Sequence, residues 1–187
     1  MTITTLDPKT ALIVIDLQKA IAAYPLVHPL GEIVKQANAL ADAFRRNDLP
    51  VVLVVVAGGS PGRTEQGRSP AELPAGATDF LPELNRLPQD HIVTKRARGA
   101  FTNTDLEAHL KALGVTQVVL VGIATSSGVE STARHAYELG FNVTLAVDAM
   151  TDGSAETHDY SIKRIFPKLG EIGTTQEIID MLDKTRV

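Results

Sequence analysis

The stretch LVGIATSSGVESTARHAYELG, residues 120–140, decides the fold of this chain. Its apolar start predicts the end of a buried strand, and the small polar residues that follow predict a tight turn. The segment VESTARHAYELG then has the pattern of a helix that ends at Gly140. A strand that passes through a short turn into a helix is typical of α/β enzymes, which often place reactive groups at such turns.

Further apolar runs repeat the strand signal, each apolar at both odd and even positions. This pattern is typical of parallel strands that are covered by helices on both faces. Helical patterns alternate with them, and the tail from Pro167 is expected to supply a sixth strand and a last helix. Capping boxes are predicted at Thr104/Glu107 and Thr174/Glu177. The expected strands are residues 11–16, 50–57, 91–94, 117–122 and 142–149, and the expected helices are residues 31–47, 104–114, 129–140 and 174–184.

This alternation predicts a doubly wound parallel sheet of the α/β class. Residues 58–77, which are rich in Gly, Pro and Ser, are expected to form a long binding loop. In such sheets, ligands bind beyond the carboxyl ends of the strands.

Composition limits the possible partners and chemistry. The 187 residues carry a net charge of -4, which argues against nucleic acid or an anionic membrane as the main partner. The sequence has no cysteine, so a disulfide, a thiolate metal site and a thiol nucleophile are excluded. It also has no apolar run of membrane-spanning length and no signal-peptide pattern at its polar start. We therefore expect one cytoplasmic domain over residues 1–187.

Three residues are predicted to meet at the carboxyl edge of the sheet. Asp16 follows the first strand, Lys95 follows the third, and Gly128 lies in the turn after the fourth. A buried carboxyl group beside an ammonium group can give and take a proton, although an ordinary ion pair at two strand ends has the same pattern. The start of a helix at Gly128 directs backbone N–H groups toward the pocket, so the backbone of Ser127 and Gly128 is expected to stabilise negative charge on a substrate.

Three motifs, in order and at the right spacing, resemble the isochorismatase-like (cysteine hydrolase) superfamily. They are VIDLQ at residues 14–18, KRARGAFTNTDL at residues 95–106 and GIATSSGVESTARHAYELGFNVTLAVDAMTD at residues 122–152. The resemblance runs over nearly the whole chain. It implies a three-layer α-β-α sandwich around a six-stranded parallel sheet, a hydrolase activity and a homo-oligomer, either a dimer or a tetramer.

The resemblance also implies residue roles. Asp16 and Lys95 match the family's catalytic aspartate and lysine, and Gly128 stands where most members have the nucleophilic cysteine. One branch, similar to the isochorismatases proper, also has glycine there and hydrolyses a vinyl ether: the aspartate protonates a carbon atom and water adds to the resulting cation. That branch's lysine motif contains Trp and Tyr, which KRARGAF lacks. A non-proline cis peptide bond is implied at Ile123–Ala124.

We therefore predict cofactor-free hydrolysis of a small, anionic organic substrate, with Asp16 as general acid/base and Lys95 as its charge partner. The residues expected to contact the substrate or shape the pocket are Gln18, Phe101, Ala124, Thr125 and Ser127. An alternative is an inactive family member that binds a small molecule or serves as an oligomeric scaffold. A further alternative is a serine esterase, in which Ser126, Asp148 and His158 follow one another in the order of α/β-hydrolases.

Metal and nucleotide binding are not expected. The segment AGGSPGRTEQGR after the second strand has no Asp or His for zinc, and the five histidines lie far apart in sequence. The stretch GGSPGR also lacks the lysine of a P-loop. Arg63 and Arg68 in this loop are either solvated or able to reach an anionic ligand.

Overall fold

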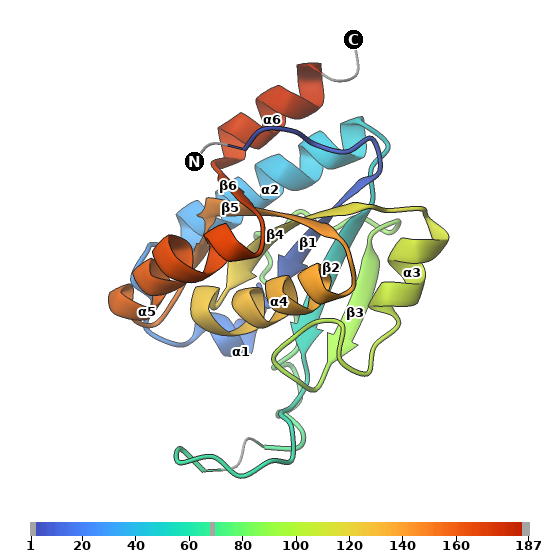
Figure 1. Cartoon of the computed structure of the whole chain (residues 1–187). Coiled ribbons are helices and arrows are strands. Elements are labelled where there is room, and N and C mark those ends of the chain that lie inside the picture. The colour runs from blue at the N-terminus through green and yellow to red at the C-terminus, as the bar shows by residue number, and fades with distance from the viewer. Residues whose placement is uncertain (1–2, 68–69, 185–187) are drawn as a thin grey trace.

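The computed structural model describes residues 3–67 and 70–184. Its centre is a six-stranded parallel sheet in the order β3-β2-β1-β4-β5-β6 (Figure 1). Because β2 and β3 lie on one side of β1 while β4 to β6 lie on the other, the strand order reverses at the boundary between β1 and β4. The strands are β1 (Thr10–Ile15), β2 (Val51–Val56), β3 (His91–Lys95), β4 (Gln117–Ile123), β5 (Asn142–Thr151) and β6 (Glu171–Gly173).

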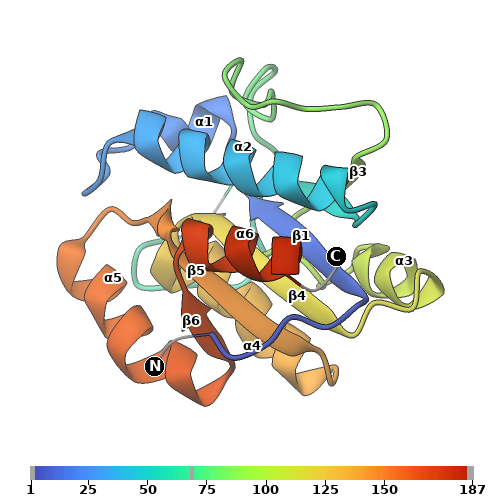
Figure 2. The same ribbon diagram turned by 90° about the horizontal axis from the view of Figure 1, so that it is seen from above.

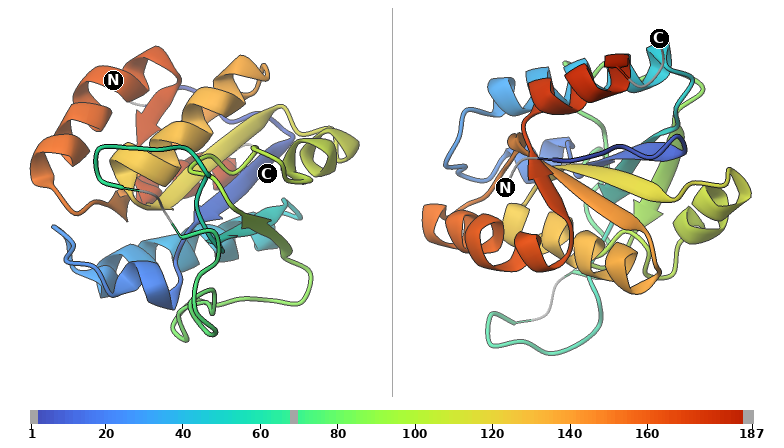
Figure 3. Two further views of the ribbon diagram at one scale, coloured as in Figure 1. Left: turned by 90° about the horizontal axis from the view of Figure 1, so that it is seen from below. Right: turned by 45° about the horizontal axis from the view of Figure 1, so that its top comes forward.

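Helices cover both faces of this sheet (Figures 2 and 3). Helices α2 and α6 pack together on one face, and α3, α4 and α5 lie on the other. The predicted three-layer α-β-α sandwich is therefore confirmed. The helices are α1 (Lys19–Ala22), α2 (Leu30–Arg46), α3 (Leu106–Ala112), α4 (Glu130–Glu138), α5 (Ala155–Tyr160) and α6 (Thr175–Lys184).

The apolar pattern of β1 explains the two cores. Leu12 and Val14 belong to the core under α2 and α6, whereas Ile13 and Ile15 belong to the core under α3 and α4. Since successive side chains of a strand point to opposite faces, a strand buried on both sides must be apolar at every position. Each of these four side chains is at most 1% exposed.

The end of the chain follows the prediction, and one predicted cap is wrong. Strand β6 and helix α6 form as expected, and the amide of Thr174 donates to the Glu177 carboxylate at 2.8 Å in a capping box. No such box forms at Thr104, because its hydroxyl donates to the carbonyl of Ala100, and Glu107 pairs with Lys111 instead. Helix α3 accordingly begins at Leu106.

The connection from β2 to β3 contains no helix and no strand in its described residues. This agrees with the predicted loop, which extends beyond the carboxyl ends of the strands (Figure 1). In the described part of the chain, no helix has the length and apolar character needed to cross a membrane.

Candidate active site

Asp16 and Lys95 meet at the carboxyl edge of the sheet. The Lys95 Nζ atom lies 3.0 Å from the Asp16 Oδ2 atom, and the two side chains are only 1% and 8% exposed. Asp16 follows β1 with a φ of 55°, a left-handed conformation that is rare for a residue other than glycine. Lys95 also donates to the carbonyl of Arg98 at 2.7 Å. The structure thus brings the two predicted residues together, and Arg98 holds the ammonium group in place.

The Asp16 carboxyl group is poised to exchange a proton near neutral pH. Burial raises its pKa from the ordinary 3.8 to about 6, although the ammonium group of Lys95 partly offsets this rise. Its second oxygen, Oδ1, is buried and has no hydrogen-bond partner in the described residues. An oxygen without a partner favours the protonated form, because the ionised form would leave negative charge unsolvated.

Gly128 leaves a niche beside this carboxyl group. It lies in a π-helical turn, Thr125–Val129, between β4 and α4. A Cβ atom at this position would lie 3.2 Å from Asp16 Oδ2, from the Ile123 carbonyl oxygen and from the Ile15 side chain. The predicted cis peptide bond at Ile123–Ala124 is present at the start of the turn. Glycine therefore keeps open the space that faces the acidic group.

Two side chains that follow β5 in the sequence form hydrogen bonds to this turn. Asp152 accepts hydrogen bonds from the amide and the hydroxyl of Ser126, both at 2.7 Å. His158 lies 2.8 Å, Nδ1 to Oγ1, from Thr125. Burial lowers the pKa of His158, and the neighbouring imidazole of His28 adds to this effect. Sequence reasoning missed the role of Asp152, since no local pattern connects it to a turn 26 residues earlier.

These contacts contradict the serine esterase alternative. The Ser126 hydroxyl donates to a carboxylate rather than to an imidazole. His158 contacts Thr125, and Asp148 instead accepts from the amide and hydroxyl of Thr175. The three candidate residues therefore do not form the relay in which a histidine activates the serine.

The Ser127 amide, which was predicted together with the Gly128 amide to stabilise an anion, is already bound within the protein. This amide donates to the carbonyl of Ala124 at 3.0 Å, within the tightly wound turn. The Ser127 hydroxyl instead accepts a hydrogen bond from the guanidinium group of Arg98 at 3.1 Å. Arg98, which sequence reasoning did not select, thus supplies the positive charge at this turn.

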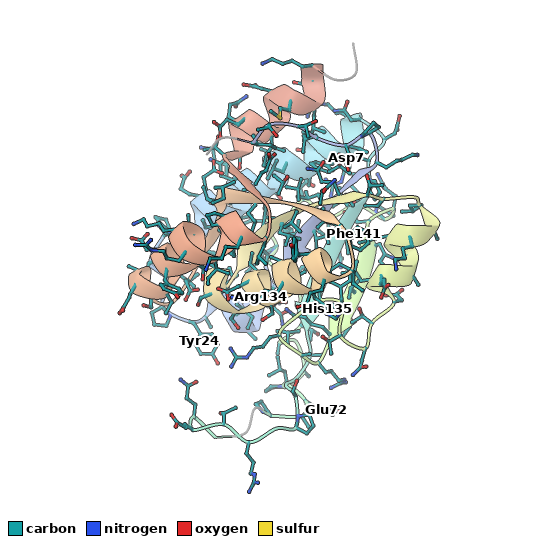
Figure 4. The ribbon with its side chains drawn as sticks, viewed as in Figure 1. Asp7, Tyr24, Glu72, Arg134, His135 and Phe141 are labelled. Carbon is teal, nitrogen blue, oxygen red and sulfur yellow. The ribbon has the colours of Figure 1, made fainter. Side chains whose placement is uncertain are left out.

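A cavity of about 770 Å³ opens over these groups, a size typical of sites for small molecules. Of the predicted site residues, five line it: Asp16, Lys95, Ala124, Ser127 and Gly128. The loop after β2 contributes Gly58, Gly59 and Arg63, and the segment after α1 contributes Tyr24. Figure 4 shows Tyr24 and Glu72 at this same end of the molecule. Arg68 lies outside the described residues.

The other three predicted contact residues, Gln18, Phe101 and Thr125, are buried and do not line the cavity. Gln18 is fully buried: its amide group donates to the carbonyls of Val56 and Ala77, and its oxygen accepts from the Val56 amide at 2.7 Å. Phe101 packs in the core against His135 and Phe141. Thr125 is fully buried against His158. Gln18 holds the end of β2 at Val56, which lines the cavity, and Thr125 belongs to the turn that lines it.

The described residues include no group of three or more His, Asp or Glu side chains arranged to hold a metal ion. Of the histidines, His91 and His109 stack on each other at a ring distance of 3.7 Å, away from the cavity. Among the residues that line the cavity, Asp16 can transfer a proton, and Lys95 and the arginines supply positive charge.

The fold and the site define an α/β protein with a ligand cavity at the carboxyl edge of a doubly wound sheet, beside a buried carboxyl–ammonium pair. Residues 10–177 match the isochorismatase domain, and the chain belongs to the isochorismatase family of hydrolases.

Individual relatives agree with this assignment. The chain is 40% identical over 181 residues to the isochorismatase family protein YwoC of Bacillus subtilis, covering 93% of this chain and 94% of that one. An isochorismatase family structure from Burkholderia thailandensis has a TM-score of 0.93 at 40% identity and covers 97% of this chain and 100% of that chain. The ureidoacrylate amidohydrolase RutB of Variovorax paradoxus is 27% identical over 201 residues, covering 91% of this chain and 80% of the relative.

Proposed function

We propose that this protein hydrolyses a small organic substrate by acid/base chemistry at Asp16, without a covalent enzyme intermediate. The observation that carries the proposal is the buried Asp16–Lys95 pair, 3.0 Å apart, that opens onto a cavity beside the empty niche at Gly128. A carboxyl pKa of about 6 supports proton transfer, because a general acid/base works best when its pKa lies near the working pH.

The chain has no thiol with which to attack a substrate. It contains no cysteine, and the position that resembles the family's nucleophile is Gly128. The two serine hydroxyl groups of the turn already make hydrogen bonds: Ser126 donates to Asp152, and Ser127 accepts from Arg98. Water is therefore the nucleophile in the proposed reaction, and the niche at Gly128 receives a substrate atom close to Asp16.

The proposed reaction on a vinyl ether balances as follows. Protonated Asp16 gives its proton to the terminal carbon of the C=C bond, which leaves a cation stabilised by the ether oxygen. Water adds to the cationic carbon, and its proton returns to the Asp16 carboxylate. In the hemiketal formed in this way, the bond between the carbon and the ether oxygen breaks. The hydroxyl group loses its proton and the departing ether oxygen gains one, which gives a ketone and an alcohol. Lys95 keeps its positive charge throughout and balances the carboxylate while Asp16 is ionised.

A test uses 2-phenoxyacrylate, which this reaction would convert to pyruvate and phenol. We expect release of phenol, incorporation of one deuterium at the pyruvate methyl group in D2O, and no covalent adduct by intact-protein mass spectrometry. Asp16→Asn should lower the rate at least about 100-fold, in line with the usual contribution of general acid catalysis. Asp159→Asn is the matched control, because Asp159 is an exposed acid outside the cavity.

Two outcomes would contradict the proposal. Turnover that survives Asp16→Asn would remove Asp16 from the chemistry, and a covalent adduct would require a nucleophile elsewhere. Binding of 2-phenoxyacrylate without turnover would support the alternative of a small-molecule binder.

A further inference from the structure

The charges that line the cavity are unbalanced. They come from one carboxyl group, Asp16, and from three basic side chains, Arg63, Lys95 and Arg98. Lys95 pairs with Asp16, whereas neither arginine has a carboxylate within 4.0 Å in the described parts of the chain. The chain as a whole has a net charge of -4, so acids are more abundant than bases. A surplus of positive charge in this one cavity indicates an anionic ligand.

Arg98 is the better placed of the two arginines. Its carbonyl accepts a hydrogen bond from the Lys95 ammonium group at 2.7 Å, and its guanidinium group donates to the Ser127 hydroxyl at 3.1 Å. One residue therefore contacts both the partner of the acid and the residue beside the Gly128 niche. Arg98 is exposed at the cavity, and the bond to Ser127 places its guanidinium group beside the residue that precedes Gly128.

The guanidinium group also has unused donors. A guanidinium has five N–H groups in a planar fork that matches a carboxylate, and the bond to Ser127 uses one of them. In the residues that the structure describes, the others have no protein partner. By contrast, Arg96 is bound to the carbonyl of Ala71 at 2.9 Å and lies 3.8 Å from Glu72. Arg96 holds the loop after β2, whereas Arg98 is free to bind a ligand.

The lining of the cavity also includes apolar side chains. Ile21, Tyr24 and Leu26 line it, and Tyr24 is 67% exposed at this end of the molecule (Figure 4). An exposed aromatic side chain at a cavity provides area for a ring or chain of a ligand. The lining therefore has a place for a charged group and a place for an apolar group.

We infer that Arg98 selects the substrate: it binds the carboxylate of a small organic acid whose apolar portion lies against Tyr24. This inference deepens the proposed function, since it names the substrate class and the residue that recognises it. Arg98 contributes binding and orientation, and the proton transfer stays with Asp16.

The test measures binding apart from turnover. The probes are 2-phenoxypropanoate, a saturated ether that the proposed reaction cannot cleave, and its neutral amide 2-phenoxypropanamide. Calorimetric titration of the unaltered protein at pH 8 should show that the carboxylate binds more tightly than the amide. Arg98→Gln should weaken binding of the carboxylate about 10- to 100-fold, in the range for a hydrogen bond to a charged group, and should change binding of the amide less than about threefold. Arg98→Lys should have an intermediate effect, because it keeps the charge and loses the fork.

Arg46→Gln is the control, since Arg46 is an exposed arginine on α2 that does not line the cavity. Thermal denaturation of each variant shows whether it is folded. Equal affinity for the two probes would overturn the inference, as would a carboxylate preference that survives Arg98→Gln or is lost only in Arg63→Gln. Because the probes are not hydrolysed, this result is independent of whether 2-phenoxyacrylate is turned over. Binding that depends on Arg98 without turnover would retain the inference and refute the proposed function.

Discussion

The stability of this protein should carry a pH-dependent contribution from Asp16 that decreases as the pH rises. Burial places the pKa of Asp16 at about 6 in the folded protein, against 3.8 for the ordinary side chain. The folded state therefore binds the proton more tightly than the unfolded state between these two values. The contribution is fully present below pH 3.8 and is lost as the pH rises through about 6.

Its size follows from the difference between the two pKa values. This difference is about 2 pH units, and at 1.36 kcal/mol per unit it corresponds to about 3 kcal/mol of unfolding free energy. Roughly half of that amount should be lost between pH 5 and pH 8, where the fold is most easily studied. An ordinary ion pair at two strand ends would have the opposite sign, because pairing would lower the carboxyl pKa.

The assay is urea denaturation of the unaltered protein and of the double variant Asp16→Asn/Lys95→Met at several pH values from 5 to 8. The double variant removes both charges, so the uncompensated lysine of a single Asp16→Asn variant does not enter the comparison. We expect the difference in unfolding free energy, unaltered minus variant, to fall by roughly 1–2 kcal/mol across this range. A difference that is constant, or that increases with pH, would show that Asp16 is a permanently ionised partner of Lys95 and would refute the reasoning.

Three more predictions concern the surroundings of Asp16. Gly128→Ala should abolish turnover and reduce the unfolding free energy by about 1–3 kcal/mol, because the added methyl group would lie 3.2 Å from three neighbours; denaturation and the phenol assay measure both effects. Gln18→Leu should reduce the unfolding free energy by about 2–4 kcal/mol, because buried backbone groups lose their hydrogen-bond partners. Gln176→Leu on the exposed face of α6 should change the unfolding free energy little. Ser126→Ala should lose about 1 kcal/mol of stability but retain turnover, and a fluorophosphonate probe should not label the unaltered protein at this serine; labelling there would restore the esterase interpretation.

The strands and the meeting of Asp16 with Lys95 could be predicted because both depend on local rules. A run that is apolar at every position identifies a buried parallel strand, and the carboxyl ends of such strands lie at one edge. The far end of β5 illustrates the limit of such rules. It extends to Thr151, two residues past the predicted end, because the pairing with β4 shifts register between Leu120 and Gly122. A register shift depends on the neighbouring strand and leaves no clear signal in the run itself.

The direction of side chains beyond the strand ends could not be predicted. Gln18 was expected in the pocket. Instead, two residues after the left-handed turn at Asp16, the Gln18 side chain donates hydrogen bonds to the carbonyls of Val56, at the end of β2, and Ala77, in the loop. Asp152 and Arg98 act on the turn after β4 through contacts between distant segments. Such hydrogen bonds follow from the folded arrangement, whereas a sequence pattern reports only the neighbours within a helix or a strand.

The sheet order explains why the charge partner of Asp16 has a long side chain. Strand β2 lies between β1 and β3, so the ends of β1 and β3 are two strand spacings, or about 10 Å, apart. An aspartate side chain is short, and only a long, flexible side chain from β3 can cover the rest of this distance and bring its charge to 3.0 Å. The Arg98 carbonyl then holds the end of that side chain in place. At this edge the two side chains are only 1% and 8% exposed, and this burial gives Asp16 its raised pKa. The strand order and the chemistry of the site therefore have a common origin.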